Sequence, residues 1–313
     1  MVKQIVKPSA LRRGDTIGIV APASSFDIER FKIGVKKLRN LGYKVRYERC
    51  IFSKYWSKPG HDKKRAEQIN RMFDDKQIKA ILCAKAGYGS IDILPYIDKQ
   101  TVKKNPKVFV GYSDITALLL CLQTVANMVV FHGPVVSGEM HEHMHKLTLE
   151  YLIKVISEPK PLGPLKFPEL KSVKSGKASG VLIGGNLSLI VNSFGTPYEI
   201  DTNDKILFLE DIAEDLRTIS GYLKQMKHMG RFDKVKAIVF GKMVDCCSSS
   251  DKERSILDVI RDIFSDVDIP IIFGFPSGHI EKRGEPRVTL PLGVMGSVDA
   301  DKLIVKVDEA GVC

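Results

Sequence analysis

The first half of the chain alternates short apolar runs with segments in which apolar residues recur at helical spacing. The apolar runs predict one strand between Gly14 and Pro22, and further strands at residues 42–47, 80–84, 107–110 and 129–134. Helical spacing is found at residues 28–41, 63–73, 91–97, 116–122 and 147–156. Strands that alternate with helices predict βαβ units and a mostly parallel, doubly wound sheet of the α/β class.

The second half continues this pattern after an irregular stretch. Strands are predicted at residues 180–186, 205–211, 237–241, 270–274, 287–290 and 302–307, and helices at residues 187–194, 216–229 and 255–264. Residues 159–179 are rich in proline and lysine and break regular structure. We therefore predict two domains, residues 1–158 and 180–313, joined by a linker at residues 159–179.

The composition is that of a soluble globular protein. The 313 residues are 44% hydrophobic and 27% charged, which permits a large core without disulfides or metal. The N-terminus has no apolar signal-peptide region, and no apolar run approaches the roughly 18–20 residues of a membrane span. The six cysteines are scattered without C-x-x-C spacing, so we expect free thiols. We expect a cytoplasmic protein with no membrane partner.

The formal net charge of +11 raises the question of a nucleic-acid partner. The lysines and arginines are spread along the chain, and no long basic run is interleaved with aromatic residues. We interpret the charge as a solvated surface and expect no nucleic-acid partner.

Ser113 lies on the turn between the strand at residues 107–110 and the helix that starts near Thr116. Gly111 permits a tight bend, and Asp114 is a good N-cap for the helix. A serine on a strand-to-helix turn faces the edge of the sheet where α/β proteins bind ligands, and the free N–H groups at the start of the helix suit an oxyanion. This is how a nucleophile elbow is built, although an ordinary turn serine fits the same stretch.

Two other residues at strand ends would complete a catalytic triad with Ser113. Glu210 ends the strand at residues 205–211, and His279 follows the strand at residues 270–274. His279 would take the proton of the serine, and Glu210 would fix the tautomer of the imidazole and stabilise its charged form. Because polar residues at strand ends are common, the spacing alone leaves a non-catalytic reading open.

A glycine-rich turn, Gly87-Tyr88-Gly89, follows the strand at residues 80–84. It lacks the third glycine of a dinucleotide fingerprint, and the chain has no ordinary phosphate loop, so neither NAD nor ATP is expected as a cofactor. Its backbone N–H groups would suit a second oxyanion donor opposite Ser113. A plain turn is the alternative.

The remaining histidines give weaker signals. His141-Glu142-His143-Met144-His145 matches the H-E-x-x-H zinc pattern, which requires both histidines on one face of a helix. Here the motif follows Ser137-Gly138 and has no apolar face, so we expect a polar loop and no metal. His132 could line the cleft, but we expect a hydrogen-bonded turn histidine.

With these residues assembled, the chain resembles the LD-carboxypeptidase family of serine peptidases, which includes the microcin C self-immunity peptidases. The resemblance covers nearly the whole chain. It is carried by seven motifs in order, GDTIGIVAP (14–22), AGYG (86–89), GYSDIT (111–116), FHGP (131–134), GGN (184–186), LEDI (209–212) and GH (278–279).

The resemblance implies a Ser-Glu-His triad at Ser113, Glu210 and His279, with oxyanion donors at the N–H groups of Asp114 and Gly87. It implies an N-terminal Rossmann-like domain, a C-terminal domain with a β-rich core, a site between the two, and a homodimer. It also implies hydrolysis, without metal or cofactor, of the L–D amide bond to the terminal D-alanine of murein tetrapeptides, a small peptide substrate of cytoplasmic cell-wall recycling.

Two departures from the family pattern concern the substrate. Lys85-Ala86 replaces the usual Arg-Gly before Gly-Tyr-Gly, and Asp215-Leu216-Arg217 replaces a frequent Pro-Tyr-Arg. An aminoacyl-nucleotide amide, as in the microcin branch, is therefore the alternative substrate. Two hypotheses assign the chain to other functional classes. It would be a non-catalytic ligand-binding protein, or a zinc peptidase built on His141 and His145.

Overall fold

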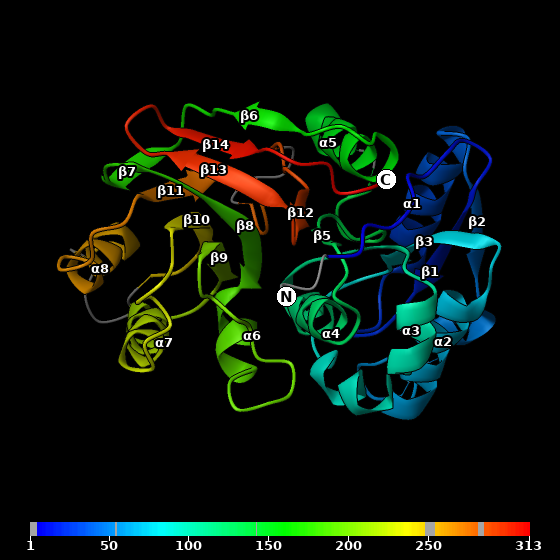
Figure 1. The fold of residues 1–313 in the computed structure, drawn as a ribbon. Coiled ribbons are helices and arrows are strands. Elements are labelled where there is room, and N and C mark those ends of the chain that lie inside the picture. The colour runs from blue at the N-terminus through cyan, green and yellow to red at the C-terminus, as the bar shows by residue number, and fades with distance from the viewer. Residues whose placement is uncertain (1–4, 54, 142, 248–253, 281–284) are drawn as a thin grey trace.

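The computed structural model describes residues 5–53, 55–141, 143–247, 254–280 and 285–313. It contains two sheets with helices packed around them, one sheet for most of each half of the chain (Figure 1). The α/β class is confirmed, with both parallel and antiparallel pairing.

The first sheet is parallel except at one edge. Its strands are β1 (Thr16–Val20), β2 (Lys44–Tyr47), β3 (Ile78–Cys83), β4 (Val108–Gly111), β5 (Val130–His132) and β12 (Leu290–Leu292). Their order is β12-β5-β4-β3-β1-β2, and only β12 runs antiparallel to its neighbour. Every residue of β4 is buried, as expected for a parallel strand covered on both faces.

The helices of the first half are α1 (Ile28–Asn40), α2 (Asp62–Asp74), α3 (Lys99–Lys104), α4 (Thr116–Ala126) and α5 (Lys146–Ser157), with 3₁₀ turns η1 (Arg49–Phe52), η2 (Ile91–Tyr96) and η3 (Ser113–Ile115). Helices α1, α2, α4 and α5 occur where the periodicity predicted them, whereas α3 and the turn η1 were not predicted. The helix predicted at residues 91–97 is the 3₁₀ turn η2. Pro95 lies inside it and has no N–H to donate, which disfavours a regular α-helix there.

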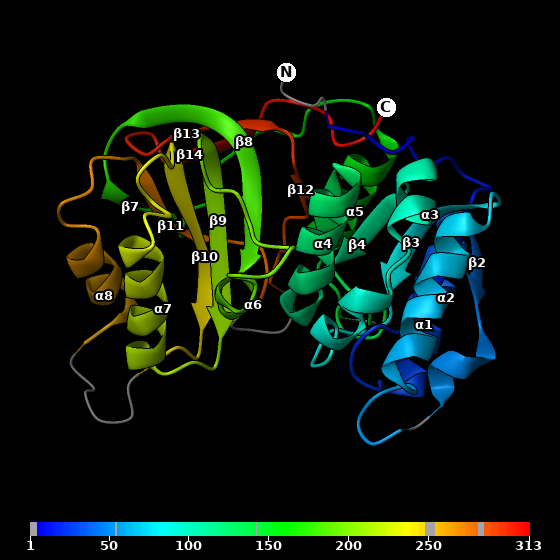
Figure 2. The ribbon, with the colours of Figure 1, turned by 60° about the horizontal axis from the view of Figure 1, so that its bottom comes forward.

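The second sheet is parallel at its centre and antiparallel at its flanks. Its strands are β6 (Gly163–Leu165), β7 (Lys171–Lys174), β8 (Lys177–Asn186), β9 (Lys205–Ile212), β10 (Ala237–Val244), β11 (Ile271–Phe275), β13 (Met295–Asp299) and β14 (Ile304–Val307). They run in the order β6-β14-β13-β8-β9-β10-β11-β7. Helices α6 (Leu187–Asn192), α7 (Leu216–His228) and α8 (Ile256–Ile263) belong to this half, and Figure 2 shows α7 and α8 side by side on one side of the sheet.

The stretch expected as a linker, residues 159–179, is not an unstructured connection. It forms β6 and β7, the two edge strands of the second sheet, and the start of β8. Edge strands are often short and rich in lysine because this discourages pairing with other chains, so the same polar composition suits an edge strand as well as a linker.

The C-terminal segment returns to the first half of the chain. The strand predicted at residues 287–290 occurs instead as β12, which pairs with β5 in the first sheet. β13 was not predicted, because its sequence, MGSVD, carries no continuous apolar run. The crossing of β12 means that each half of the chain contributes to the packing around the end of β5.

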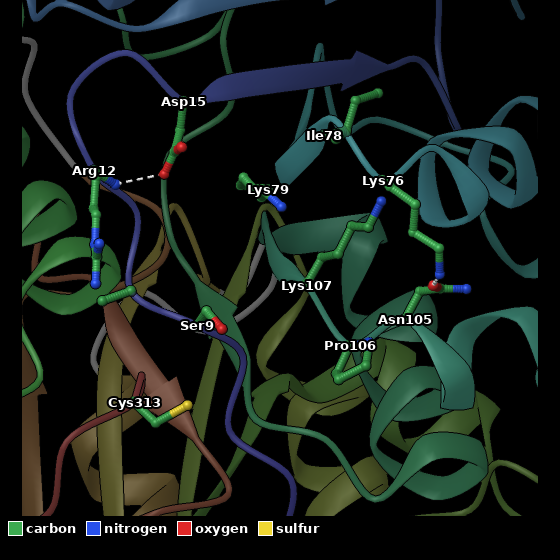
Figure 3. Close-up of a pocket in the computed structure, with 11 residues that line it drawn as sticks. Ser9, Arg12, Asp15, Lys76, Ile78, Lys79, Asn105, Pro106, Lys107 and Cys313 are labelled. Carbon is green, nitrogen blue, oxygen red and sulfur yellow. Dashed lines mark hydrogen bonds between the residues drawn. The ribbon is translucent and has the colours of Figure 1, made fainter.

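A basic cavity of about 450 Å³ lies at the end of the first sheet where the parallel strands begin, and Figure 3 shows it. Lys107 is buried there, and its ammonium group donates to the carbonyl oxygens of Met72 (2.8 Å) and Asp75 (2.5 Å) at the end of α2. Burial lowers the pKa of Lys107 to about 8. Lys107 thus donates to carbonyl groups at the end of α2, at the edge of the sheet opposite to Ser113.

Within the part of the chain that the structure describes, no helix is long and apolar enough to cross a bilayer.

Candidate active site

Ser113 occupies a strained turn between β4 and α4. Its φ angle of 59° lies in the left-handed region, which non-glycine residues seldom adopt and which is frequent at active sites. Gly111 makes the turn possible, because a Cβ there would lie 2.5 Å from the side chain of Ile115. The strand, turn and helix predicted around Ser113 are therefore all present.

Asp114 joins this turn to the glycine-rich turn beside it. Its buried carboxylate accepts hydrogen bonds from the N–H groups of Gly89 (3.2 Å) and Ser90 (2.9 Å). Burial raises the pKa of Asp114. The prediction that Asp114 caps α4 is wrong: the N-cap position belongs to Ile115, and the carboxylate binds a neighbouring loop because that loop supplies two unpaired donors.

The Gly87-Tyr88-Gly89 turn packs tightly against Ser24. Gly87 has a φ angle of +117°, and a Cβ there would lie 2.4 Å from Ser24 Oγ, so only glycine fits. The N–H of Tyr88 donates to Ser24 Oγ at 3.0 Å. Among the described residues, the N–H groups of Gly87 and Asp114 have no hydrogen-bond acceptor, which leaves both available to an oxyanion.

Arg65 supports the same turn from behind, a role that the sequence did not reveal. Its buried guanidinium donates to the carbonyl oxygens of Pro22 and Gly89 (3.1 Å for the latter) and pairs with Asp62 at 2.5 Å. The basic stretch around Arg65 resembles an ordinary exposed helix face. Only the tertiary structure shows that this arginine is buried and binds the loops that contain Pro22 and Gly89.

Buried Glu210 and half-buried His279 form a pair at the ends of the second sheet's strands. His279 Nδ1 lies 2.6 Å from Glu210 Oε2, and the backbone N–H of His279 donates to the same oxygen at 3.1 Å. Burial would raise the pKa of Glu210, but the contacts with His279 outweigh burial and lower the pKa. Because an ionised carboxylate can only accept hydrogen bonds, its contact with Nδ1 favours the tautomer of His279 that carries the proton on Nδ1.

Gly278 is required for this pair to form. Its φ angle is +83°, and a Cβ there would lie 2.5 Å from the carboxyl group of Glu210. The glycine in the GH motif therefore lets the backbone approach the carboxylate closely enough for the N–H of His279 to donate to it.

Tyr112 connects the Ser113 turn with the histidine. The ring of Tyr112, the residue directly before Ser113, lies 5.0 Å from the ring of His279, centre to centre. Within the described residues there is no hydrogen bond between Ser113 Oγ and His279. Such bonds are often absent from enzymes without substrate and form when the substrate binds.

His132 lies deeper, inside β5 and not in a turn. Its ring is 6.0 Å from that of Tyr112 and 5.2 Å from that of Phe208, and neither ring nitrogen has a hydrogen-bond partner among the described residues. Burial lowers the pKa of His132 to about 4. The prediction of a hydrogen-bonded turn histidine is wrong, because pairing of β12 with β5 encloses this position.

A polar network ties the second half of the chain to α4. The N–H of Asn186 donates to Thr116 Oγ1 at 3.1 Å, and Asn186 Nδ2 donates to Asp211 at 2.9 Å. Burial raises the pKa of Asp211 to about 6. Gly185 brings the two segments together, since a Cβ there would lie 2.7 Å from Thr116. The motifs GGN and LEDI thus contain both packing contacts and candidate site residues.

The H-E-x-x-H pattern does not form a zinc site of the kind the motif requires. His141 lies in a bend, and His145 caps α5 by accepting from the N–H of Leu147 at 3.1 Å, so the two histidines do not share a helix face. Glu142 lies outside the described residues. No group of three or more metal-ligating side chains occurs among the residues that are described.

Comparison with known proteins places these features in a family. The LD-carboxypeptidase N-terminal domain model matches residues 17–133, and the LD-carboxypeptidase C-terminal domain model matches residues 179–298. A probable murein peptide carboxypeptidase of Bacillus subtilis is 34% identical over 98% of this chain and 95% of its own length. The microcin C7 self-immunity protein MccF of Escherichia coli is 30% identical over 95% of this chain and 94% of its own.

Solved structures agree with the sequence comparisons. The structure of MccF in complex with glutamyl sulfamoyl guanosine superimposes with a TM-score of 0.90 at 26% identity, covering 98% of this chain and 99% of that one. The muramoyltetrapeptide carboxypeptidase of Oxalobacter formigenes shares the fold, with a TM-score of 0.83, 24% identity and coverage of 94% and 98%. The chain therefore belongs to the LD-carboxypeptidase family of serine peptidases.

Proposed function

We propose that this protein is a serine carboxypeptidase that releases the terminal D-alanine of murein tetrapeptides by cleaving an L–D amide bond. The observation that carries the proposal is the contact of half-buried His279 with buried Glu210 next to the strained Ser113 turn. The Bacillus subtilis relative is named a probable murein peptide carboxypeptidase, which supports the choice of substrate.

The mechanism follows from the positions of these groups. His279 Nε2 takes the proton of Ser113 Oγ as the oxygen attacks the amide carbonyl, and ionised Glu210 stabilises the imidazolium through Nδ1. The N–H groups of Asp114 and Gly87 would bind the oxyanion. The protonated His279 gives its proton to the leaving D-alanine amine, and a water molecule activated by the same imidazole then hydrolyses the acyl-enzyme.

An aminoacyl-nucleotide amide is the second candidate substrate. It is favoured by the likeness to MccF, whose structure holds glutamyl sulfamoyl guanosine. The same triad serves both substrates, because each reaction is the attack of a serine on an amide. The choice therefore rests on the groups that bind the rest of the substrate. Near the expected substrate region, Lys85-Ala86 and Asp215-Leu216 depart from the family pattern.

We further propose that the two halves matched by the family models act as two domains in a cytoplasmic homodimer. The first would supply Ser113 and the oxyanion donors, and the second Glu210 and His279. The activity should then depend on how the two halves pack against each other.

Incubation with tetrapeptides that contain L-lysine or diaminopimelate at the third position tests the proposal, with released D-alanine measured by mass spectrometry. Ser113→Ala should lower turnover by several orders of magnitude without loss of the fold. Ser265→Ala, at an exposed serine after α8, is the matched control and should be fully active. If Ser113→Ala keeps more than a few per cent of the activity, the assignment of the nucleophile is wrong.

An aminoacyl sulfamoyl nucleoside assayed in parallel separates the two substrates. A protein without turnover of either substrate, and without labelling of Ser113 by a serine-directed phosphonate, would be a non-catalytic ligand-binding protein.

A further inference from the structure

A buried ion pair lies directly beneath the residue that precedes Ser113. Arg287 Nη1 is 2.9 Å from Glu139 Oε1, and the exposed fractions of the two side chains are 4% and 14%. It is a contact between charges, since Nη1 makes no aligned hydrogen bond. Glu139 follows β5 and Arg287 precedes β12, so the pair joins the two halves of the chain.

Both charges are retained despite burial. Burial would raise the pKa of Glu139, but the guanidinium of Arg287 and the O–H of Tyr112 outweigh burial and lower the pKa. Burial opposes the charge of Arg287 as well, yet Glu139 raises the pKa of Arg287 above its ordinary value. A buried ion pair is costly to desolvate and is poor evidence for stability, so its presence next to the site calls for another explanation.

The pair holds the ring of Tyr112 at two points. The phenol O–H donates to Glu139 Oε1 at 2.7 Å, and the guanidinium carbon of Arg287 lies 4.8 Å from the ring centre. A ring attached through its hydroxyl and covered by a cation cannot turn about its axis without breaking one of these contacts.

Tyr112 in turn touches both halves of the candidate triad. Its backbone leads into Ser113, whose left-handed φ angle of 59° persists only if the surroundings hold it. The edge of its ring meets the ring of His279 at 5.0 Å. His279 is fixed at Nδ1 by Glu210, but a single bond leaves the ring free to swing, and the Tyr112 ring limits that motion from the side.

We propose that Glu139 and Arg287 are positioning residues for the reaction, acting through Tyr112 to orient Ser113 and His279. This inference rests on the proposed function, because it assumes that Ser113 is the nucleophile and His279 its base. It does not depend on which amide is the substrate. If the pair only joined β5 to β12, its loss would change stability and leave the reactivity of folded protein untouched.

The rate at which a serine-directed phosphonate modifies Ser113 is the best readout, since it reports the activated nucleophile for any substrate. Arg287→Met should slow this rate by about 100-fold, the size expected when a reacting group is displaced by about 1 Å. Arg287→Lys should recover part of the loss, because it keeps the charge next to Glu139. In the peptidase assay, kcat should fall while KM stays within about twofold, because the substrate-binding groups are untouched.

Two gentler variants keep the inference testable if Arg287→Met does not fold. Tyr112→Phe keeps the ring and removes the hydroxyl that contacts Glu139 and Arg287, and it should slow labelling by about tenfold. Glu139→Gln removes the charge at nearly constant size and should slow labelling by about tenfold, since it weakens the contacts that hold the Tyr112 ring beside His279.

The chain offers a matched control at the other end of the second sheet. Arg231 also pairs with a half-buried glutamate, Glu199, and lies over an aromatic ring, that of Phe194, at 5.4 Å. Arg231→Met should lower the melting temperature but leave phosphonate labelling at the wild-type rate.

The outcomes separate the two proposals. If Tyr112→Phe, Glu139→Gln and Arg287→Met are labelled at the wild-type rate once folded, the pair is structural and the inference fails while the proposed function stands. If wild-type Ser113 is not labelled, or Ser113→Ala keeps the activity, the proposed function fails, and the inference fails with it.

Discussion

Replacing His132 by phenylalanine should make the protein less sensitive to acid. The imidazole is completely buried in β5, and neither nitrogen has a hydrogen-bond partner among the described residues. Burial, the principal cause, lowers the pKa of His132 from an ordinary 6.5 to about 4. A neutral histidine enclosed in this way is a latent source of acid denaturation.

The sign and size of the effect follow from linkage. As the pH falls below 6.5 the unfolded chain binds a proton on His132, whereas the folded protein does not until the pH reaches about 4. Stability present at pH 7 is therefore lost between these two values. At about 1.4 kcal/mol for each pH unit, the full gap corresponds to about 3 kcal/mol. Phenylalanine binds no proton and should escape this loss.

The measurement is urea unfolding followed by far-ultraviolet circular dichroism at several pH values from 7.5 to 4. Fluorescence is a poor probe here, because the single tryptophan, Trp56, is 92% exposed. His132→Phe should lose about 3 kcal/mol less than wild type over this range. His228→Gln, at an exposed histidine that ends α7, is the control and should follow the wild type.

Equal losses of stability in His132→Phe and wild type would refute the reasoning. Glu210 interacts electrostatically with His132, so the titration of Glu210 is part of the measured difference. A second variant, His132→Leu, should reproduce the reduced slope if the missing proton is the cause, since it differs from phenylalanine in shape and also lacks a titrating group.

Two further predictions concern the turns that build the site. Gly278→Ala should separate Glu210 from His279, because the added Cβ would lie 2.5 Å from the carboxyl group. The kcat of this variant should fall by at least about 100-fold. Turnover near the wild-type value would show that this close approach of the backbone to Glu210 is not needed. Asp114→Asn should leave the N–H of Gly89 or of Ser90 without its acceptor. The free energy of unfolding measured in urea should fall by about 1–3 kcal/mol, and phosphonate labelling should become slower. Unchanged values in both assays would show that the carboxylate is not needed to hold that turn.

Local chemistry explains what could be predicted of the candidate site. Some features of the site involve only a few consecutive residues, so the sequence shows them directly. They are the serine at a strand-to-helix turn, the glycine-rich turn and the GH pair after a strand. The structure brings Glu210 and His279 into contact and places Tyr112 against His279. The seven motifs that indicated the family are such local features too, and the comparisons confirm the family.

The remaining parts of the site depend on partners distant in the chain. Arg65, Glu139 and Arg287 are charged residues in polar stretches, where the sequence predicts solvent exposure. Each is buried because another segment covers it, and each is stabilised by a partner that local patterns do not identify. The side chain of Asp114 is likewise used differently from its local prediction, because the turn at Gly89 supplies two donors that a helix start would otherwise provide.

By itself, the sequence determined the alternating strands and helices, the sharp turn at Ser113 and the family, because hydrophobic periodicity and glycine geometry act over a few residues. Only the tertiary structure decided that residues 159–179 form edge strands and that β12 crosses back to pair with β5. Strand pairing of this kind is a contact between distant segments, and short polar strands carry little periodicity to reveal it. The pairing of β12 with β5 also places Arg287 beside Glu139. The surroundings of Ser113 therefore depend on residues near the C-terminus as well as on its own neighbours in the chain.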